Sequence, residues 1–354
     1  MKRAREGQSA EDVMKLFKQL SAAEQARFVR LLKGGGSGSD DMEEYLTEQR
    51  FSGGRVCPIC GSIHVCRNGK RENGTQKFVC RDCGKSFSIR KNTVFSGTHK
   101  GLSTWKEYME CMAEGLTISE SAERCGISEG TSFNWRHKIL DSLGESQKGV
   151  TLSGIVEADE TFVPVSYKGG GSVSGKGVSR KPHKRGGENH RRGLSDGLVC
   201  VPCAVDRKGN AVSRMAKLGK CSSEALDKVL GGRVSSESTL CSDDDASYRK
   251  FSKRNGNSLV QIKGGKGSVK GIYHIQHQNA YHSKLKAFLA SFKGVSSKYL
   301  NNYLTWNNVV EHGGGTLREK AARILSSVTT TLFEETCLNV KFRPVLPLLV
   351  KNQS

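Results

Sequence analysis

Acidic residues are scarce in this sequence. Its 354 residues include 35 Asp and Glu against 56 Lys and Arg, a formal net charge of +21. The shortage is greatest from Ala246 to Val310, where 11 Lys and Arg occur without a single acid. Such an excess of positive charge favours a polyanionic partner, and we expect that partner to be nucleic acid.

Long hydrophobic runs are also missing. No apolar stretch approaches the roughly 20 residues of a membrane-spanning helix, and the first residues contain no apolar stretch of the secretory type. With a mean hydropathy of −0.49, we expect a cytoplasmic, nucleoid-associated protein without a membrane partner. The length allows two or three modules with separate cores.

Cysteines, in contrast, are frequent, and their spacing indicates a metal site. Two Cys-x2-Cys pairs, 19 residues apart, have the spacing of a structural four-thiolate zinc site: Cys57, Cys60, Cys80 and Cys83. A module of about forty residues has too little core to fold alone, and zinc binding would stabilise it. Phe78 and Phe87 would form its small strand core. Cys66 is interpreted as a spare thiol, and Cys200 and Cys203 as buried residues of an apolar strand.

Residues 102–143 predict three helices. Thr117 and Glu120 form a capping box at the start of the second helix, Gly126 ends it and Ser128 caps the third. A short helix, a glycine-containing turn and a further helix are typical of helix-turn-helix modules, although ordinary three-helix units share this pattern. The residues predicted to face DNA are Thr131, Asn134, Arg136 and Lys138.

Further segments frame these modules. Residues 9–33 predict two amphipathic helical pieces, 34–39 a Gly/Ser linker, and the last forty residues a helical tail. Residues 166–197 are a Gly-rich insertion with eight Lys and Arg against two acids. We expect it to contact phosphates, with these residues as candidates: Lys181, Lys184, Arg185, Arg191 and Arg192.

Two aspartates lie in apolar, β-branched stretches that predict strands. Glu157, Asp159 and Thr161 would share one face of the first strand, and Asp243 ends the second. A carboxylate is costly in such a strand unless it has a partner or a metal. Two strand-borne aspartates suit Mg²⁺ or Mn²⁺ chemistry on phosphodiesters; the alternative for either acid is a solvated turn.

A third ligand from the acid-free window must be an amide or an imidazole. Residues 277–292, HQNAYHSKLKAFLASF, predict an amphipathic helix. Asn279 and Lys286 differ by only about 20° on its polar face. Asn279 can offer a carbonyl oxygen to a metal and Lys286 can hold the DNA backbone, with His282 as an alternative ligand; the other interpretation is an amphipathic surface helix without a site.

Taken in order, these motifs resemble the ISXO-like family of bacterial insertion-sequence transposases. The similar stretches lie within residues 43–308 and include CPICGS, VCRDCGKSFSIRKNTVF, VEADETF, LCSDDDASYRKF and NAYHSKLKAFLASF. The resemblance implies a ribonuclease-H-like fold with a D-D-E or D-D-N site. Asp159 then looks like the first acid, Asp243 like the second and Asn279 like the third ligand, with Lys286 seven residues on. It also implies two or more subunits in a synaptic complex.

The expected fold is therefore multidomain α+β. It comprises an N-terminal helical region (1–50), a zinc ribbon (51–92), a helix-turn-helix domain (93–147), a ribonuclease-H-like catalytic α/β domain with a mixed sheet (148–312) and a C-terminal helical tail (313–354). The expected function is that of a DNA transposase. As a homodimer or larger complex, it would bind terminal inverted repeats of double-stranded DNA and use Mg²⁺ or Mn²⁺ to cleave a strand and join it to target DNA. The alternatives are a transposase-derived DNA-binding regulator without catalysis and a ribonuclease-H-like nuclease.

Overall fold

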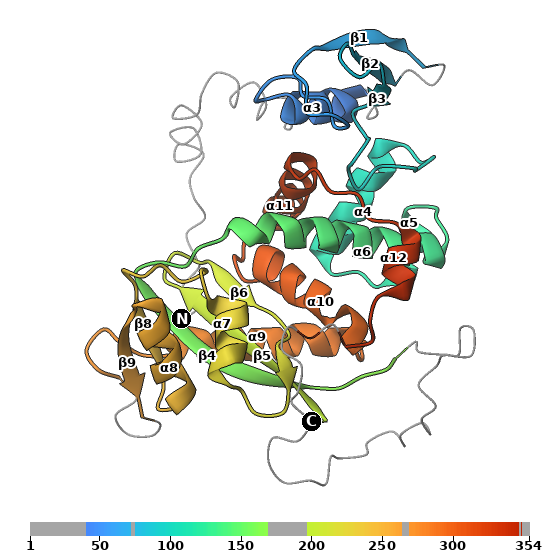
Figure 1. Cartoon of the computed structure of the whole chain (residues 1–354). Coiled ribbons are helices and arrows are strands. Elements are labelled where there is room, and N and C mark those ends of the chain that lie inside the picture. Colours follow the sequence, from blue (N-terminus) through green and yellow to red (C-terminus); the bar gives the residue numbers. More distant parts are fainter. Residues whose placement is uncertain (1–39, 72–74, 169–196, 264–268, 347, 349–354) are drawn as a thin grey trace, which may run out of the picture.

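The computed structural model describes residues 40–71, 75–168, 197–263, 269–346 and 348. Most of the helices and a small three-stranded sheet occupy one end of this part of the chain, and a six-stranded sheet with helices on its faces occupies the other (Figure 1). None of the described helices is both long and apolar enough to cross a membrane. The predicted helical pieces at 9–33, the linker at 34–39 and most of the insertion at 166–197 lie outside the described residues.

The three-stranded sheet follows helix α3 (Asp40–Arg50). Its strands β1 (Val65–Lys70), β2 (Gln76–Cys80) and β3 (Ser86–Ser88) are antiparallel in chain order. Phe78 lies opposite Phe87 in the β2–β3 register, and their buried rings are 5.9 Å apart. The strand core predicted from these two phenylalanines is confirmed.

Three helices come next, α4 (Leu102–Glu114), α5 (Ile118–Arg124) and α6 (Glu129–Ser146). Both hydrogen bonds of the predicted capping box at Thr117 are present, and the Ser128 side chain accepts from the backbone N–H of Thr131. Trp135 of α6 stacks on Trp105 of α4 with 3.7 Å between ring centroids. The local signals of the sequence thus placed the helix ends correctly.

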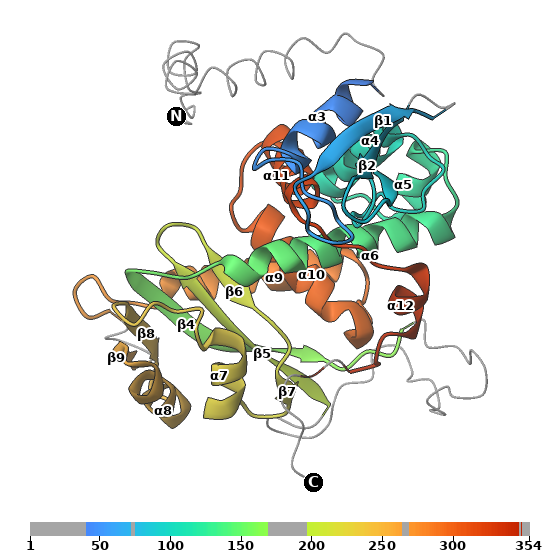
Figure 2. The same cartoon turned by 45° about the horizontal axis from the view of Figure 1, so that its top comes forward.

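The C-terminal helices return to this helical end of the molecule. Short 3₁₀ segments at 147–149 and 297–299 and a π-helical turn at 307–311 accompany α10 (Leu300–Trp306), α11 (Leu317–Thr330) and α12 (Cys337–Phe342). Helix α11 packs against α4 and α6 (Figure 2), and its Ile324 and Val328 are buried in the core that contains Trp105. The end of the chain therefore completes the core of residues far earlier in the sequence.

The large sheet contains β4 (Ile155–Pro164), β5 (Leu198–Asp206), β6 (Ala211–Ser213), β7 (Lys217–Leu218), β8 (Thr239–Asp243) and β9 (Ser258–Ile262). Its order is β6-β5-β4-β8-β9, with β7 paired to β5. The β4–β5 and β5–β6 pairs are antiparallel, whereas β4–β8 and β8–β9 are parallel. The predicted mixed sheet is confirmed.

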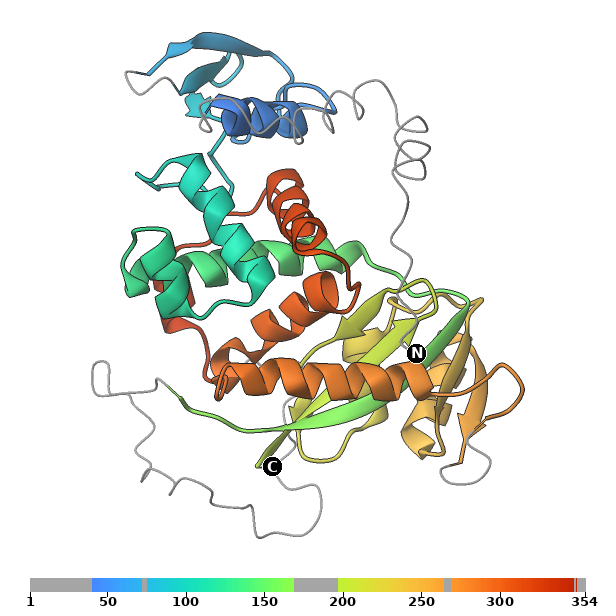
Figure 3. The same ribbon diagram turned by 180° about the vertical axis from the view of Figure 1, so that it is seen from behind.

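Helices cover both faces of this sheet (Figures 1 and 3). Helices α7 (Ser223–Leu230) and α8 (Ala246–Asn255) lie on one face, and α9 (Gln276–Ser291) crosses the other. On β5, Cys200 is buried in the core beneath α7 and α8, while Cys203 is buried with Tyr281 and Leu285 of α9. The prediction that both cysteines are packing residues is confirmed, and they point to opposite faces.

Candidate functional site

The four predicted zinc ligands come together in the small sheet. Their sulfur atoms all lie within 4.8 Å of one another: Cys57, Cys60, Cys80 and Cys83. Two sulfur pairs, each joining the two Cys-x2-Cys turns, are 3.8 and 3.6 Å apart. A tetrahedral ion with metal–sulfur bonds of about 2.3 Å needs sulfurs about 3.8 Å apart. Gly61 and Gly84 take the positive φ values of 77° and 69° that let each turn close. The cluster fits a tetrahedral, thiolate-bound ion.

The residues of α6 that were predicted to face DNA differ in how far they are exposed to solvent. Thr131, Asn134 and Lys138 are half-buried, and the start of the helix from Ser128 to Gly130 is exposed. Helices α5, α10, α11 and α12 pack against α6. The accessible part of α6 is therefore concentrated near its first turn.

The prediction that Arg136 faces DNA is wrong, because its side chain is buried. Only 1% of Arg136 is exposed, and its guanidinium lies 5.2 Å from the ring centroid of Trp306 in α10. The same group donates to the Leu116 carbonyl and to Ser121 Oγ, at 2.8 and 3.2 Å. Arg136 thus ties α6 to α5 and α10. The residues predicted in the basic insertion, Lys181, Lys184, Arg185, Arg191 and Arg192, lie outside the described residues.

The two predicted acids meet on one face of the large sheet. In the parallel register, Val156 lies opposite Leu240 and Glu157 opposite Cys241. Continued two residues further, this register puts Asp243 beside Asp159 on the face that α9 covers. The next two acids are engaged elsewhere: Asp244 pairs with Arg249, and Asp245 caps α8 and pairs with Lys220.

The carboxylates of Asp159 and Asp243 lie in a site that disfavours their negative charge. Burial, together with the charges of Glu160 and Asp243, raises the pKa of Asp159 to about 7. Burial also raises the pKa of Asp243. Within the described part of the chain, Oδ1 of Asp243 is buried and has no hydrogen-bond partner. Desolvated acids with an unused oxygen are what a divalent cation would stabilise.

Helix α9 presents His282 to this pair of acids. His282 Nδ1 lies 3.7 Å from Asp159 Oδ2, and its side chain is 10% exposed. The other ring nitrogen, Nε2, is 2.8 Å from the amide nitrogen of the fully buried Gln278. Burial and the charge of Lys286 lower the pKa of His282 to about 4, so the imidazole is neutral at neutral pH.

Asn279, the ligand predicted from the sequence, lies on an exposed part of α9 one turn before His282. Among the described residues, it is His282 whose side-chain nitrogen approaches Asp159. Lys286 is exposed, and its positive charge acts on both Asp159 and His282. The helix face directed at the acids is therefore centred on His282, the alternative that the sequence left open, with Lys286 one turn beyond.

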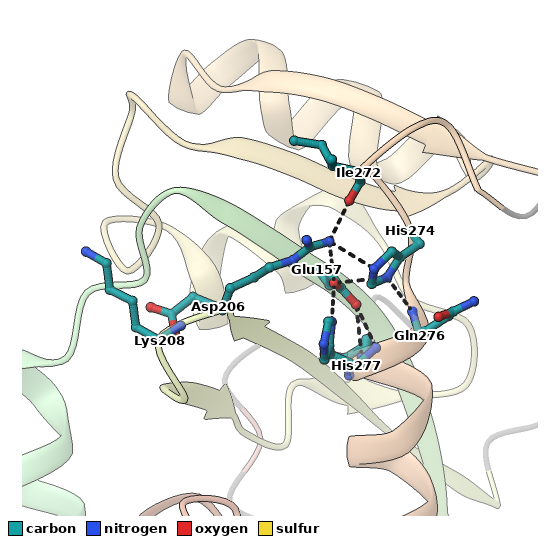
Figure 4. Close-up of polar contacts among 9 residues, drawn as sticks. Glu157, Asp206, Lys208, Ile272, His274, Gln276 and His277 are labelled. Atoms are coloured by element: carbon teal, nitrogen blue, oxygen red, sulfur yellow. Dashed lines mark hydrogen bonds and ion pairs between the residues drawn. The ribbon is translucent and has the colours of Figure 1, made fainter.

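A second polar cluster lies at the start of α9 and was not predicted as part of the site (Figure 4). The cluster surrounds the buried side chain of Glu157. Glu157 lies two residues before Asp159 on β4 and shares its strand face. Its partners are His274, His277 and Arg207. The period-two alternation of β4 was the available signal, since it placed Glu157 and Asp159 on one face.

Comparison with known proteins finds similarity to proteins of insertion elements. Residues 151–306 match the family model described as the ISXO2-like transposase domain. An uncharacterized protein in transposable element ISH50 of Halobacterium salinarum is 22% identical over 262 residues, covering 73% of this chain and 86% of that protein. The resemblance of the motifs to this transposase family is therefore confirmed for residues 151–306.

Two solved structures are also similar to the chain. One is a pre-cleavage Mos1 transpososome, with 12% identity, coverage of 89% of this chain and 94% of that chain, and a TM-score of 0.21. The other is the Mos1 mariner paired end complex with Mn, with 12% identity, coverage of 63% and 78%, and a TM-score of 0.20. With TM-scores this low, neither likeness carries an argument about this chain.

Proposed function

We propose that this protein is a DNA transposase that cleaves a DNA strand at the end of an insertion element and joins it to target DNA with the help of Mg²⁺ or Mn²⁺. The observation that carries the proposal is that Asp159 and Asp243 lie on neighbouring strands, near enough for the charge of Asp243 to raise the pKa of Asp159. Asp159 has a pKa of about 7, and Asp243 has a buried oxygen without a hydrogen-bond partner among the residues that the structure describes. The transposase family match covers both residues.

The sheet supports a ribonuclease-H-like fold for the catalytic domain. Three antiparallel strands, β6, β5 and β4, continue into two strands parallel to β4, with helices on both faces. Asp159 lies in the central strand, and Asp243 ends the strand beside it. The site thus lies at the carboxyl end of β8, where a backbone that leaves the sheet opens space for a substrate.

Asp159 and Asp243 would hold the metal, and His282 would complete its ligands from α9. A bound Mg²⁺ or Mn²⁺ would supply a Lewis acid that activates the attacking oxygen and stabilises the leaving one. A ligating imidazole normally donates its other N–H to an oxygen. Oε1 of Gln278 is buried without a partner in the described part of the chain. Turning that amide by 180° would let it accept from Nε2 of His282 and leave the Nδ1 lone pair facing Asp159.

The remaining elements would bind DNA. Lys286 is exposed one turn beyond His282, where its ammonium group would pair with a backbone phosphate. In helix-turn-helix modules the first residues of the recognition helix contact base edges, which suits the exposed start of α6 and half-buried Thr131 and Asn134. Structural Zn²⁺ on the four cysteines would hold the small sheet as a zinc ribbon. The synaptic complex would contain two or more copies.

The test is incubation of the full-length protein with labelled DNA from the ends of its own insertion element, with Mg²⁺ or Mn²⁺. We expect metal-dependent nicks and joined products, both lost in Asp159→Ala and Asp243→Ala. Asp244→Ala is the matched control, because Asp244 pairs with exposed Arg249 rather than facing the site. Binding without nicking would identify a regulator, and nicking without joining a nuclease; either result overturns the proposal.

A further inference from the structure

Helix α9 begins without a side-chain cap of its own. Its N-cap residue is Ile275, which cannot accept a hydrogen bond through its side chain. The first backbone N–H groups of a helix need acceptors, and the positive end of the helix dipole favours a negative charge there. The strand β4 supplies both through Glu157.

The Glu157 carboxylate is surrounded by donors from the start of α9 (Figure 4). Oε2 accepts from the backbone N–H groups of His277 and Gln278 at 2.8 and 3.2 Å. Oε1 is 2.7 Å from Nδ1 of His277 and 3.3 Å from Nδ1 of His274. Only 1% of Glu157 is exposed. A buried carboxylate that accepts from two backbone N–H groups of a helix fixes the position of the helix along its axis and its rotation about that axis, both relative to the strand.

Arg207 strengthens this contact from the β5–β6 turn. Its guanidinium donates to Glu157 Oε1 at 3.3 Å, to the Ile272 carbonyl at 2.7 Å and to His274 Nε2 at 3.1 Å. Glu157, His274 and His277 have a spacing that suits a metal ion. Because Arg207 already supplies a positive charge to Glu157 and His274, the arrangement fits a structural contact better than a metal site.

The spacing between this contact and the candidate metal site is similar along the strand β4 and along the helix α9. From Glu157 to Asp159 is about 7 Å along β4, and from Gln278 to His282 is about 6 Å along α9. Because the backbone N–H of Gln278 is held at the Glu157 carboxylate, the next turn of α9 brings the His282 side chain to Asp159. We propose that Glu157, braced by Arg207, is a positioning residue that sets His282 opposite Asp159. The role of His282 as a ligand rests on the proposed function.

Hydrogen exchange and metal binding test this together on the full-length protein. In Glu157→Gln, we expect at least about tenfold faster amide exchange over residues 276–283. Loss of such a supporting contact weakens metal binding by about 10- to 100-fold, so the Mn²⁺ dissociation constant should rise accordingly. Adding Glu157→Gln to His282→Ala should weaken Mn²⁺ binding little further, because both changes remove the same ligand.

Asp206→Asn is the matched control. Asp206 is also buried and accepts from the backbone N–H groups of Lys208 and Asn210, yet it serves the β5–β6 turn rather than α9. Asp206→Asn should lower stability without changing exchange in α9 or Mn²⁺ affinity. Should Glu157→Gln fail to fold, Arg207→Met addresses the same contact from a side chain that is 33% exposed.

The outcomes separate this inference from the proposed function. Unchanged α9 exchange in the Glu157 and Arg207 variants overturns the positioning role, whatever the metal result. If α9 loosens but Mn²⁺ affinity stays the same or falls additively with His282→Ala, Glu157 does not act through His282, and the inference is also overturned. If the wild type binds no Mn²⁺, the proposed function fails, and faster exchange over 276–283 that Asp206→Asn does not share still supports Glu157 as the residue that holds this turn.

Discussion

Replacing Asp159 by Asn should stabilise the metal-free protein while removing its metal site. Burial raises the pKa of Asp159 from 3.8 to about 7. Between these pH values the folded protein keeps a proton that the unfolded chain has released, so the stability falls as the pH rises through this window. Each pKa unit corresponds to about 1.4 kcal/mol, so ionised Asp159 costs up to about 4 kcal/mol above pH 7. Asn carries no such cost, and its amide oxygen still accepts from the backbone N–H of Glu160.

Thermal unfolding in EDTA measures this difference. The advantage of Asp159→Asn should grow by about 3 kcal/mol between about pH 5 and about pH 8. For a domain of this size, that corresponds to roughly 6 to 12 °C in the unfolding midpoint. Added Mg²⁺ or Mn²⁺ at the higher pH should raise the midpoint of the wild type and leave the variant unchanged.

The control is again Asp206→Asn, which removes an acceptor from a satisfied turn and should lower the midpoint. An Asp159→Asn protein that is less stable than the wild type at pH 8 would refute the reasoning. So would an advantage that does not change with pH, because the cost would then not arise from ionisation of the carboxylate.

Three further predictions concern residues whose positions the structure settles. His282→Ala should reduce Mn²⁺-dependent nicking at least about 100-fold, because a metal ligand is lost. Asn279→Ala, at an exposed position, should change the nicking rate less than about threefold. If both variants lower the nicking rate equally, Asn279 is again a candidate ligand. Cys57→Ser should lose bound zinc and unfold the β1–β3 sheet, seen by metal analysis and by exchange over 57–88, because zinc binding supplies that module's stability. Arg136→Met should destabilise the protein by about 2 to 4 kcal/mol through loss of its contacts to Trp306 and Leu116, with DNA affinity of the folded protein unchanged in a binding titration.

Local features of the fold could be predicted from the sequence because they depend on neighbouring residues. The Cys-x2-Cys turns close on their own glycines, and the capping box at Thr117 involves residues three apart. The alternation of β4 places Glu157 and Asp159 on one face whatever the strand packs against. The choice of Asp243 over its two acidic neighbours also agrees with the strand register.

Predictions that depended on the rotation of a helix about its axis needed contacts that only the tertiary structure supplies. The helical wheel of residues 277–292 placed Asn279 and Lys286 on the same polar face. It does not determine which residues of that face point toward the sheet. The contact of Glu157 with the first turn of α9 sets this rotation, and it turns His282 toward Asp159. Arg136 was assigned to the DNA face for a similar reason, since Trp306, which covers it, lies 170 residues further along the chain.

The sequence by itself determined the kinds of site in this protein: a four-cysteine cluster, strand-borne acids and a basic, acid-free helix that follows them. These rest on residue type and short spacing, which act within one turn or one strand. Only the tertiary structure decided which side chain of that helix approaches the acids and which arginine is buried. Both depend on contacts between distant segments, where the position of one helix is set by a carboxylate on a strand more than a hundred residues away.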